Sequence, residues 1–582
     1  ETFTQVLDTC ERIAREKYAP FNRLVDTEEP RVVSGPDGER VVLPQATHDA
    51  WKAYADSGML AAAQDVELGG MQLPYTLEAA ANAFFAKASV SIGSGMLTTG
   101  NANLLMVHGT PLQQRVFAAN EFTGRWSGTM CLSEPQAGSS LSDVATRAEA
   151  DGADFEADPL GPRYRLRGNK MWISAGEHEL TENIIHLVLA KIPGPDGRLV
   201  PGTRGISLFI VPKKLVDAEA CLTGERNDVA LAGLNHKCGW RGTTNTLLNF
   251  GEGRFRPGGQ AGAIGYLVGR PGEGLRCMFH MMNEARIGVG LGAVMLGYAG
   301  YEVSLEYAKQ RSQGRPITGA GKDASQPPVP IFQHADVRRM LLAQKSYVEG
   351  GLALALYCSR LVDELHTGEP PAAHEAGTLL EVLTPIAKSW PSEWGLEANS
   401  LAIQVLGGYG YTRDFMVEQY WRDNRLNMIH EGTHDIQALD LLGRKVVMDG
   451  GAGLKLLAGR VNETIRRAGQ VEGLAVPANE LATALQKLGA ATKSAWATGV
   501  PEEALANATP YLQAFGHVVL AWLWLDVALA VERPGSAVGV FGQGKLAAMR
   551  YFFAYELPKI DAWLGVVSRR EALVRELPDE AF

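Results

Sequence analysis

Apolar residues recur at intervals of three and four from Glu1 to about Thr123, a spacing that predicts helices. Around Gly124 the pattern changes to short or alternating apolar runs bounded by Gly, Pro, Asn or Asp. Such runs are typical of strands separated by turns. They predict strands at residues 164–174, 183–192, 205–212 and 243–250, and a β region that ends near residues 257–264.

Helical periodicity returns from about Gly272. Residues 280–311 predict one long helix, whose small residues would let a neighbouring helix approach closely. A polar, proline-rich stretch separates it from a second helical run at residues 335–365. The longest apolar run, residues 518–531, is interrupted by Asp526. It is shorter than a bilayer requires and predicts a buried helix.

The pattern therefore predicts an α+β fold in four parts. These are a helical domain (1–123), a middle β domain (124–264), a helical bundle (265–449) and a C-terminal helical extension (450–582). The absence of βαβ alternation argues against a Rossmann fold, and no GxGxxG follows a predicted strand. A nucleotide cofactor, if one binds, is held in another way.

Composition and charge narrow the classes of function. The formal net charge of −10 argues against a protein that binds nucleic acid through phosphate contacts, which need a basic surface. The six cysteines form no CxxC or CxH cluster, so we expect no metal site and reduced thiols. No signal peptide is visible at Glu1, and we expect a cytoplasmic protein.

Three segments carry candidate chemistry. In residues 130–148 a Ser-Glu-Pro turn is followed by Ala-Gly-Ser-Ser, and such open loops suit a phosphate or the polar edge of a flavin. Taken alone, this segment is more typical of a plain surface turn. In residues 169–177 a strand carries Trp172 two positions before Ser174. That pair suits a ring system with a polar rim, although, taken alone, a core tryptophan is the better interpretation.

The third segment, residues 404–446, combines a glycine run with a glutamate. The glycines at residues 407, 408 and 410 permit close approach of the backbone to a ligand. Glu431, followed by Gly432, precedes an apolar helical pattern. A glutamate there stabilises the helix dipole or acts as a general base in a pocket.

In this order and layout, the three segments resemble the acyl-CoA dehydrogenase family. The resemblance covers residues 1–449. The extension resembles that of longer bacterial members, including the 3-methylmercaptopropionyl-CoA dehydrogenase group. The resemblance implies an acyl-CoA dehydrogenase-like fold with an N-terminal helical domain, a β-barrel-like middle domain, a helical bundle and the C-terminal extension. It also implies FAD as cofactor.

Transferred residue by residue, the resemblance implies the following roles. Glu431 is the base, and Arg286 helps to position it. FAD contacts within the subunit come from Leu132, Ser133, Gly138, Ser139, Trp172, Ser174 and Thr433. Contacts to the FAD of a partner subunit come from Arg311, Gln404 and Gly408. Substrate contacts come from Ser139, Asn283, Arg286 and Gly432.

Three departures from the family pattern bear on these roles. The sequence SQGRPI follows Arg311 and lacks the phenylalanine common there, which weakens the expected adenine contacts. Asp435 stands where a glutamine often meets FAD. His430 replaces a frequent tyrosine and either packs beneath the substrate, which we favour, or tunes Glu431.

The implied reaction is α,β-dehydrogenation of a fatty acyl-CoA to trans-2-enoyl-CoA, as in β-oxidation. The thioester oxygen would accept hydrogen bonds from the Glu431 N–H and a ribityl hydroxyl of FAD, because an α-proton is too weakly acidic without such support. Electrons would pass to an electron-transferring flavoprotein, and the enzyme would be a homodimer. Alternatives are 3-methylmercaptopropionyl-CoA as substrate and, more remotely, an acyl-CoA oxidase.

A remote alternative of another class is a DNA-associated flavoprotein of the same superfamily. Residues 446–582 contain 13 Lys and Arg against 14 Asp and Glu, so the extension has no basic excess for phosphate contacts. The same balance argues against binding at a membrane surface, which a Lys/Arg-rich polar face usually supports.

Overall fold

The computed structural model describes residues 1–36, 38–93, 95–533 and 537–582. These residues group into two compact units, Glu1–Ala285 and Arg286–Phe582. The predicted helical and β segments lie in the first unit, and most of the bundle and the whole extension lie in the second. The boundary falls inside one helix, α8 (Gly274–Gln310).

The first unit begins with helices, and an aromatic cluster forms part of the core among the first of them. The rings of Tyr18 and Tyr54 pack on Phe85 with centroids 5.0 and 4.9 Å away. The helices are α1 (Thr2–Ile13), α2 (Asn22–Thr27), α3 (Gln45–Asp56), α4 (Tyr75–Ala88), α5 (Met96–His108), α6 (Pro111–Gln113) and α7 (Ala119–Phe122). The purely helical prediction was wrong at one hairpin, β1 (Arg31–Gly35) with β2 (Gly38–Val42). These strands are short and mostly exposed, so they leave no burial alternation to detect.

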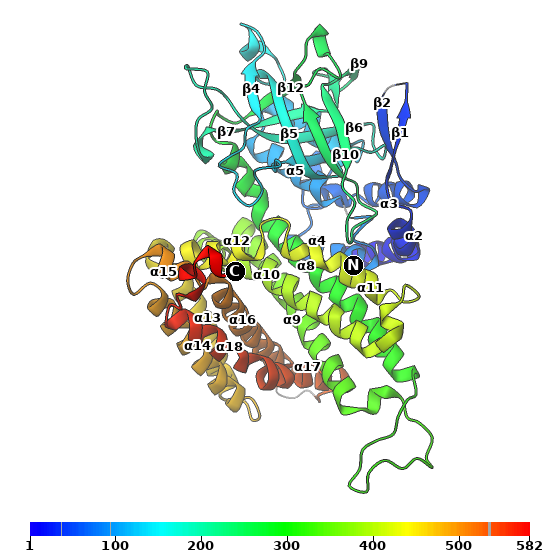
Figure 1. Ribbon diagram of the computed structural model, residues 1–582, viewed down its shortest axis with the longest axis vertical. Coiled ribbons are helices and arrows are strands. Elements are labelled where there is room, and N and C mark those ends of the chain that lie inside the picture. Colours follow the sequence, from blue (N-terminus) through cyan, green and yellow to red (C-terminus); the bar gives the residue numbers. More distant parts are fainter. Residues whose placement is uncertain (37, 94, 534–536) are drawn as a thin grey trace. The chain divides into compact units, whose positions relative to one another are not determined.

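The rest of the first unit is built on an eight-stranded sheet (Figure 1). Its strands are β3 (Trp126–Cys131), β4 (Arg147–Ala150), β5 (Arg163–Ser174), β6 (Asn183–Lys191), β7 (Ile206–Pro212), β10 (Val229–Leu234), β11 (Asn245–Phe250) and β12 (Ala263–Val268). A separate pair is β8 (Lys214–Val216) with β9 (Leu222–Arg226). The order is β10-β11-β5-β12-β7-β6-β3, and β4 pairs with both β5 and β6. The sheet thus closes on itself, and the four strands predicted by position are β5, β6, β7 and β11.

In the second unit, long helices pack closely where glycines meet a neighbour. These helices are α8, α9 (Ala335–Thr367) and α10 (Pro370–Leu406) (Figure 1). A Cβ built on Gly290 of α8 would lie 1.8 Å from the Ala387 carbonyl oxygen of α10. One on Gly297 would lie 3.2 Å from the Gly395 carbonyl oxygen. The small residues of α8 therefore permit the close approach that the sequence predicts.

Shorter helices complete the bundle and form the extension. They are α11 (Val417–Asn424), α12 (His434–Asp440), α13 (Ala452–Ala468), α14 (Ala475–Ala495), α15 (Pro501–Leu505), α16 (Ala508–Val531), α17 (Val540–Tyr551), α18 (Ile560–Ser568) and α19 (Leu573–Glu576). A buried polar network anchors the extension to the bundle. His517 of α16 accepts a hydrogen bond from Trp390 of α10 (3.1 Å) and pairs with Glu556 (3.1 Å).

Helix α16 contains the longest apolar run. It has 24 residues, so it extends well beyond the run seen in the sequence. Among the described residues it is the one helix long and apolar enough to cross a membrane by length and composition, and 78% of its most apolar window is buried inside the protein. Its burial matches the predicted core helix. The six cysteines are all free.

Candidate active site

The predicted base lies in a strained turn of the second unit. Glu431 has a left-handed backbone, with φ of 54°, and Gly432 follows with φ of 89°. A non-glycine residue in this region costs about 1–3 kcal/mol and persists only where its surroundings enforce it. Thr433 then caps α12, its hydroxyl accepting from the Ile436 N–H at 3.4 Å. The turn therefore presents Glu431 just before the helix, as predicted.

Two buried side chains hold this turn by its carbonyls. The Gln437 side-chain amide donates to the Glu431 carbonyl at 3.1 Å. The Lys388 ammonium, from α10, donates to the Gly432 carbonyl at 2.7 Å. Both side chains are fully buried. Neither was predicted from the sequence, although Lys388 is a single cation within an apolar helical run, a pattern that a search for buried charges would detect.

Burial and the neighbouring charges act on the pKa of Glu431 in opposite directions. Desolvation raises the pKa of its carboxyl group above the ordinary value, while the charges of Lys388 and Arg286 lower it in part. Arg286 donates to Asp440 at 2.8 Å, and its Nε is buried without a hydrogen-bond partner among the described residues. Glu431 is thus a carboxylate of raised basicity, which suits proton abstraction.

His430 is a partly buried side chain whose ring is neutral. Its ring shares a 2.9 Å hydrogen bond with the Asn427 side chain. Burial, helped by the charge of Lys388, lowers its pKa to about 3. A neutral, hydrogen-bonded ring agrees with the packing role that we favoured from the sequence.

In the first unit, the predicted flavin-facing residues share one loop and one strand. The loop after β3 is fastened to β5, because the Lys170 ammonium donates to the Leu132 carbonyl at 3.0 Å and the Met171 N–H donates to the Ser133 carbonyl at 3.0 Å. Lys170 also pairs with buried Glu134 at 2.9 Å. Glu134 accepts from the Ala145 and Thr146 N–H groups at the far end of the loop.

The exposed side chains of this loop and strand leave room for a ring system. Trp172 is 57% exposed and has φ of 65°, an unusual placement for so large an apolar side chain. Ser174 is partly exposed and lies 3.5 Å from the Asn245 amide. Gly138 and Ser139 are exposed, and a Cβ on Gly138 would meet nothing within 4 Å. An open loop beside an uncovered tryptophan fits the edge and face of a flavin.

A cavity of about 780 Å³ in the second unit brings together two of the residues predicted to reach a partner's FAD. Arg311 and Gly408 both line it, with Tyr307, Lys322 and His334. Gln404 is exposed in the last turn of α10 and does not line the cavity. Asn283 is partly buried on α8 within the first unit. The cavity was not predicted, because its walls come from separate segments.

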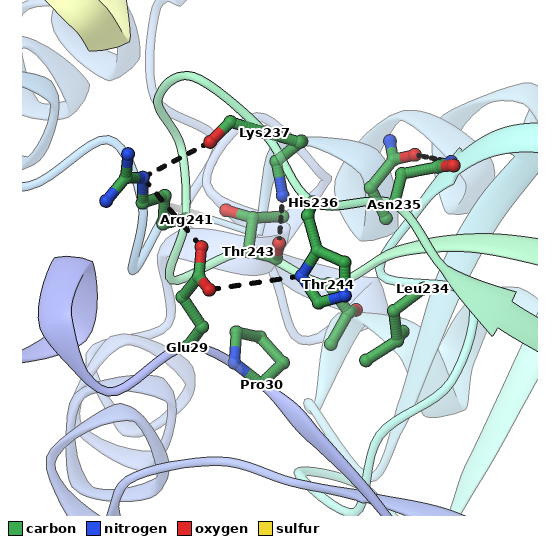
Figure 2. Close-up of a pocket in the computed structure, with 10 residues that line it drawn as sticks. Glu29, Pro30, Leu234, Asn235, His236, Lys237, Arg241, Thr243 and Thr244 are labelled. Carbon is green, nitrogen blue, oxygen red and sulfur yellow. Dashed lines mark hydrogen bonds and ion pairs between the residues drawn. The ribbon is translucent and has the colours of Figure 1, made fainter.

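A second hollow, in the first unit, is too small for a substrate. Its volume is about 10 Å³, room for about one water molecule. Glu29 lies in its wall, 3.9 Å from His236 and 3.8 Å from Arg241 (Figure 2). None of the predicted site residues lines it.

Comparison with known proteins gives the family. Residues 272–446 match the model described as acyl-CoA dehydrogenase, C-terminal domain, and residues 457–578 match acetyl-CoA dehydrogenase C-terminal like. The chain is 37% identical to 3-methylmercaptopropionyl-CoA dehydrogenase of Ruegeria pomeroyi over 94% of this chain and 89% of that protein. It is 32% identical to a butyryl-CoA dehydrogenase of Syntrophomonas wolfei, covering 99% and 93%.

The fold agrees with a solved structure. The acyl-CoA dehydrogenase of Bacillus anthracis, crystallised with FAD, superposes with a TM-score of 0.75 at 19% identity, covering 97% of this chain and 88% of that one. The match includes the extension, which confirms the predicted fold class. By sequence over nearly its whole length, this chain belongs to the acyl-CoA dehydrogenase family.

Proposed function

We propose that the protein removes an α- and a β-hydrogen from a short, unbranched acyl-CoA thioester and yields the trans-2-enoyl-CoA. Family membership makes the enzyme a flavin-dependent oxidoreductase with FAD as cofactor. The observation that supports this reaction most is the setting of Glu431. Its carboxyl group has a raised pKa and lies in a strained turn, and the neighbouring cations Lys388 and Arg286 form no ion pair with it. FAD, when bound, accepts the β-hydrogen with its electron pair.

The residues of the chain supply the acid–base part of the reaction. Glu431 takes the α-proton, and the turn fixes the direction of its side chain. Among the described residues none accepts a hydrogen bond from the Glu431 N–H. That donor is therefore available to the thioester oxygen, where negative charge develops. Asn283, Ser139 and Gly432 are the proposed contacts to the acyl-CoA.

The names of the relatives support a short substrate. One acts on 3-methylmercaptopropionyl-CoA and the other on butyryl-CoA, as their names state. The first acyl chain is that of pentanoyl-CoA with one methylene replaced by sulfur. A hydrophobic pocket that fits a given chain length distinguishes one methylene by about 10–200-fold and does not strongly reject an isostere.

The test is initial dye reduction with butyryl-, pentanoyl-, octanoyl- and palmitoyl-CoA, and with 3-methylmercaptopropionyl-CoA. We expect kcat/KM for the two isosteres to agree within about tenfold and to fall at least about tenfold for octanoyl-CoA. A preference for palmitoyl-CoA would refute the short-chain proposal. A thioether preference beyond a hundredfold would instead assign the enzyme to the sulfur-containing substrate.

We further propose an electron-transferring flavoprotein as the acceptor, with a role in β-oxidation. The support is the family alone. Turnover with oxygen as sole acceptor should be slow beside turnover with a dye or with that flavoprotein. Peroxide release that keeps pace with dye reduction would mark an oxidase.

A further inference from the structure

The lysine that braces the catalytic turn is in an unusual place. Lys388 lies in α10 between two buried neighbours, Ala387 and Ser389, and its own exposure is 0%. Placing an ammonium in such surroundings costs several kcal/mol unless it is paired. Burial lowers the pKa of Lys388 to about 8, even though Glu431 raises it in part. At neutral pH the side chain is still predominantly charged.

The backbone next to Lys388 lies close to α8. Pro391 has no N–H to donate to the Ala387 carbonyl one helical turn earlier, and this carbonyl meets Gly290 of α8. Arg286 lies one turn before Gly290 on α8. The close contact of the two helices thus brings Lys388 and Arg286 to the same turn, and both charges act on Glu431.

Neither Lys388 nor Arg286 forms an ion pair with the carboxylate of Glu431. The ammonium of Lys388 is engaged by the Gly432 carbonyl, and Arg286 is engaged by Asp440. The described residues include no ion pair between Glu431 and either cation within 4.0 Å, whereas the buried carboxylate of Glu134 is paired directly with Lys170. The carboxylate oxygens are therefore left for the substrate while two positive charges stabilise their ionised form.

Other titratable groups on the helices that flank the Glu431 turn have partners of their own among the described residues, and Asp435 of α12 accepts a hydrogen bond from Thr509 at 3.3 Å. On α10, Glu393 pairs with His434 of α12 at 3.0 Å and accepts from Gln513 of the extension at 2.6 Å. Asp440 of α12 is engaged by Arg286, and His430 is neutral. Among these described groups, Lys388 is the cation that contacts no carboxylate directly.

We propose that Lys388 is a positioning residue for proton abstraction, holding the Glu431–Gly432 turn through the Gly432 carbonyl and holding the carboxylate ionised through its charge. The inference rests on the proposed function. The two effects of Lys388 can be tested separately, because the hydrogen bond to the Gly432 carbonyl needs only a donor, whereas the electrostatic effect on Glu431 needs a positive charge.

Three variants separate these effects. Lys388→Gln retains a donor without charge, Lys388→Met has neither, and Lys388→Arg has both. The control is Lys445→Met. Lys445 is also a buried lysine of the second unit, but it is paired with Glu381 and does not act on Glu431. FAD content and circular dichroism are recorded for each variant.

The readout is the first-turnover rate of flavin bleaching by pentanoyl-CoA, mixed anaerobically between pH 5.5 and 9. The rate of the wild type falls as pH drops through the pKa of Glu431. In Lys388→Gln and Lys388→Met the pH at which the rate falls should rise by about one unit, which lowers the rate by about tenfold at any pH below that fall. At pH 9 the Gln variant should regain the wild-type rate within about threefold and the Met variant should not. In Lys388→Arg and Lys445→Met, the pH at which the rate falls should be the same as in the wild type.

Several outcomes would overturn the inference. One is a rate that falls at the same pH in the Gln and Met variants as in the wild type. Another is a Gln variant that fails to fold or to bind FAD, because a residue that only positions the turn is not required for either. If Glu431→Gln itself bleaches at the wild-type rate, the proposed function fails instead, and the two failures are thereby distinguished.

Discussion

Two residues that resemblance places at the flavin and the substrate, Trp172 and Glu431, both have left-handed backbones, with φ of 65° and 54°. Strain of this kind gathers at functional sites, where surrounding contacts enforce it. Here the contacts are identifiable. Lys388 and Gln437 hold the turn at Glu431, and the Met171 N–H fastens the strand before Trp172 to the Ser133 carbonyl.

The buried pair of Glu134 and Lys170 gives a prediction at the scale of one residue. Burial alone raises the pKa of Glu134, but Lys170, Thr146 and the Ala145 N–H together lower it below its ordinary value. Glu134→Gln removes the charge and leaves Lys170 buried and unpaired, which costs about 3–5 kcal/mol. We expect a lower midpoint of urea unfolding and a faster loss of FAD, which is measured by flavin fluorescence.

The control for that change is Glu149→Gln, which removes the exposed partner of Arg147. Exposed pairs contribute about 0–1 kcal/mol, so this variant should behave like the wild type. The contribution of Glu134 is present above its unfolded pKa and is lost as pH falls through its lower folded pKa. The difference in stability between the Glu134→Gln variant and the wild type should therefore shrink in acid. A difference independent of pH would contradict this account.

Among the helices and strands, the contact of α8 with α10 gives the sharpest prediction. Gly290→Ala would place a methyl group 1.8 Å from the Ala387 carbonyl oxygen, so the helices must separate. Overpacking of this kind destabilises by about 1–3 kcal/mol or more, and separation also displaces Arg286 and Lys388. We expect a lower Tm and a slower first turnover.

Gly292, two residues along the same helix, is the matched control. A Cβ there meets nothing within 4 Å. Because alanine is favoured over glycine inside a helix by about 0.5–1 kcal/mol, Gly292→Ala should raise the Tm slightly. If the two variants lose equal stability, the close contact is not what makes Gly290 necessary.

The same elements show how much the sequence predicts. Residues 280–311 predict α8 because small and apolar residues recur every three or four positions. Residues 164–174 predict β5 because they form a short run bounded by turn residues. The hairpin of β1 and β2 was missed because its strands are mostly exposed. Glu431 and Trp172 were found because each lies in a local motif. Lys388 and the pair of Glu134 with Lys170 were not, since their partners lie 36 to 44 residues away and local patterns carry no information on such pairings.

For the whole molecule, the central question is how subunits assemble. We propose a homodimer in which Arg311 and Gly408, which line one cavity, contact the FAD of the partner subunit. The support is the resemblance of these positions to the family. Complementation tests it, because a defect in Arg311 would affect the partner's site while a defect in Glu431 affects its own.

Two co-expressed, separately tagged heterodimers make the comparison. One pairs an Arg311→Ala subunit with a Glu431→Gln subunit and should retain one working site, about half the activity of wild type. The other pairs a doubly substituted subunit with a wild-type subunit and should be nearly inactive. The reverse ranking would show that Arg311 serves the FAD of its own subunit, and an active monomer in sedimentation would refute the assembly altogether.

The most direct measurement of the central claim, that Glu431 is the base, uses Glu431→Gln. The substitution keeps the size of the side chain but removes its capacity to accept the α-proton, and a general base contributes about 10²–10⁴-fold. The loss should reach the upper end of that range, because His430 is neutral and hydrogen-bonded to Asn427. On anaerobic mixing with pentanoyl-CoA, the wild type should bleach within the first turnover, whereas the variant should show only a binding shift in its flavin spectrum. Bleaching of the variant at close to the wild-type rate would contradict the account.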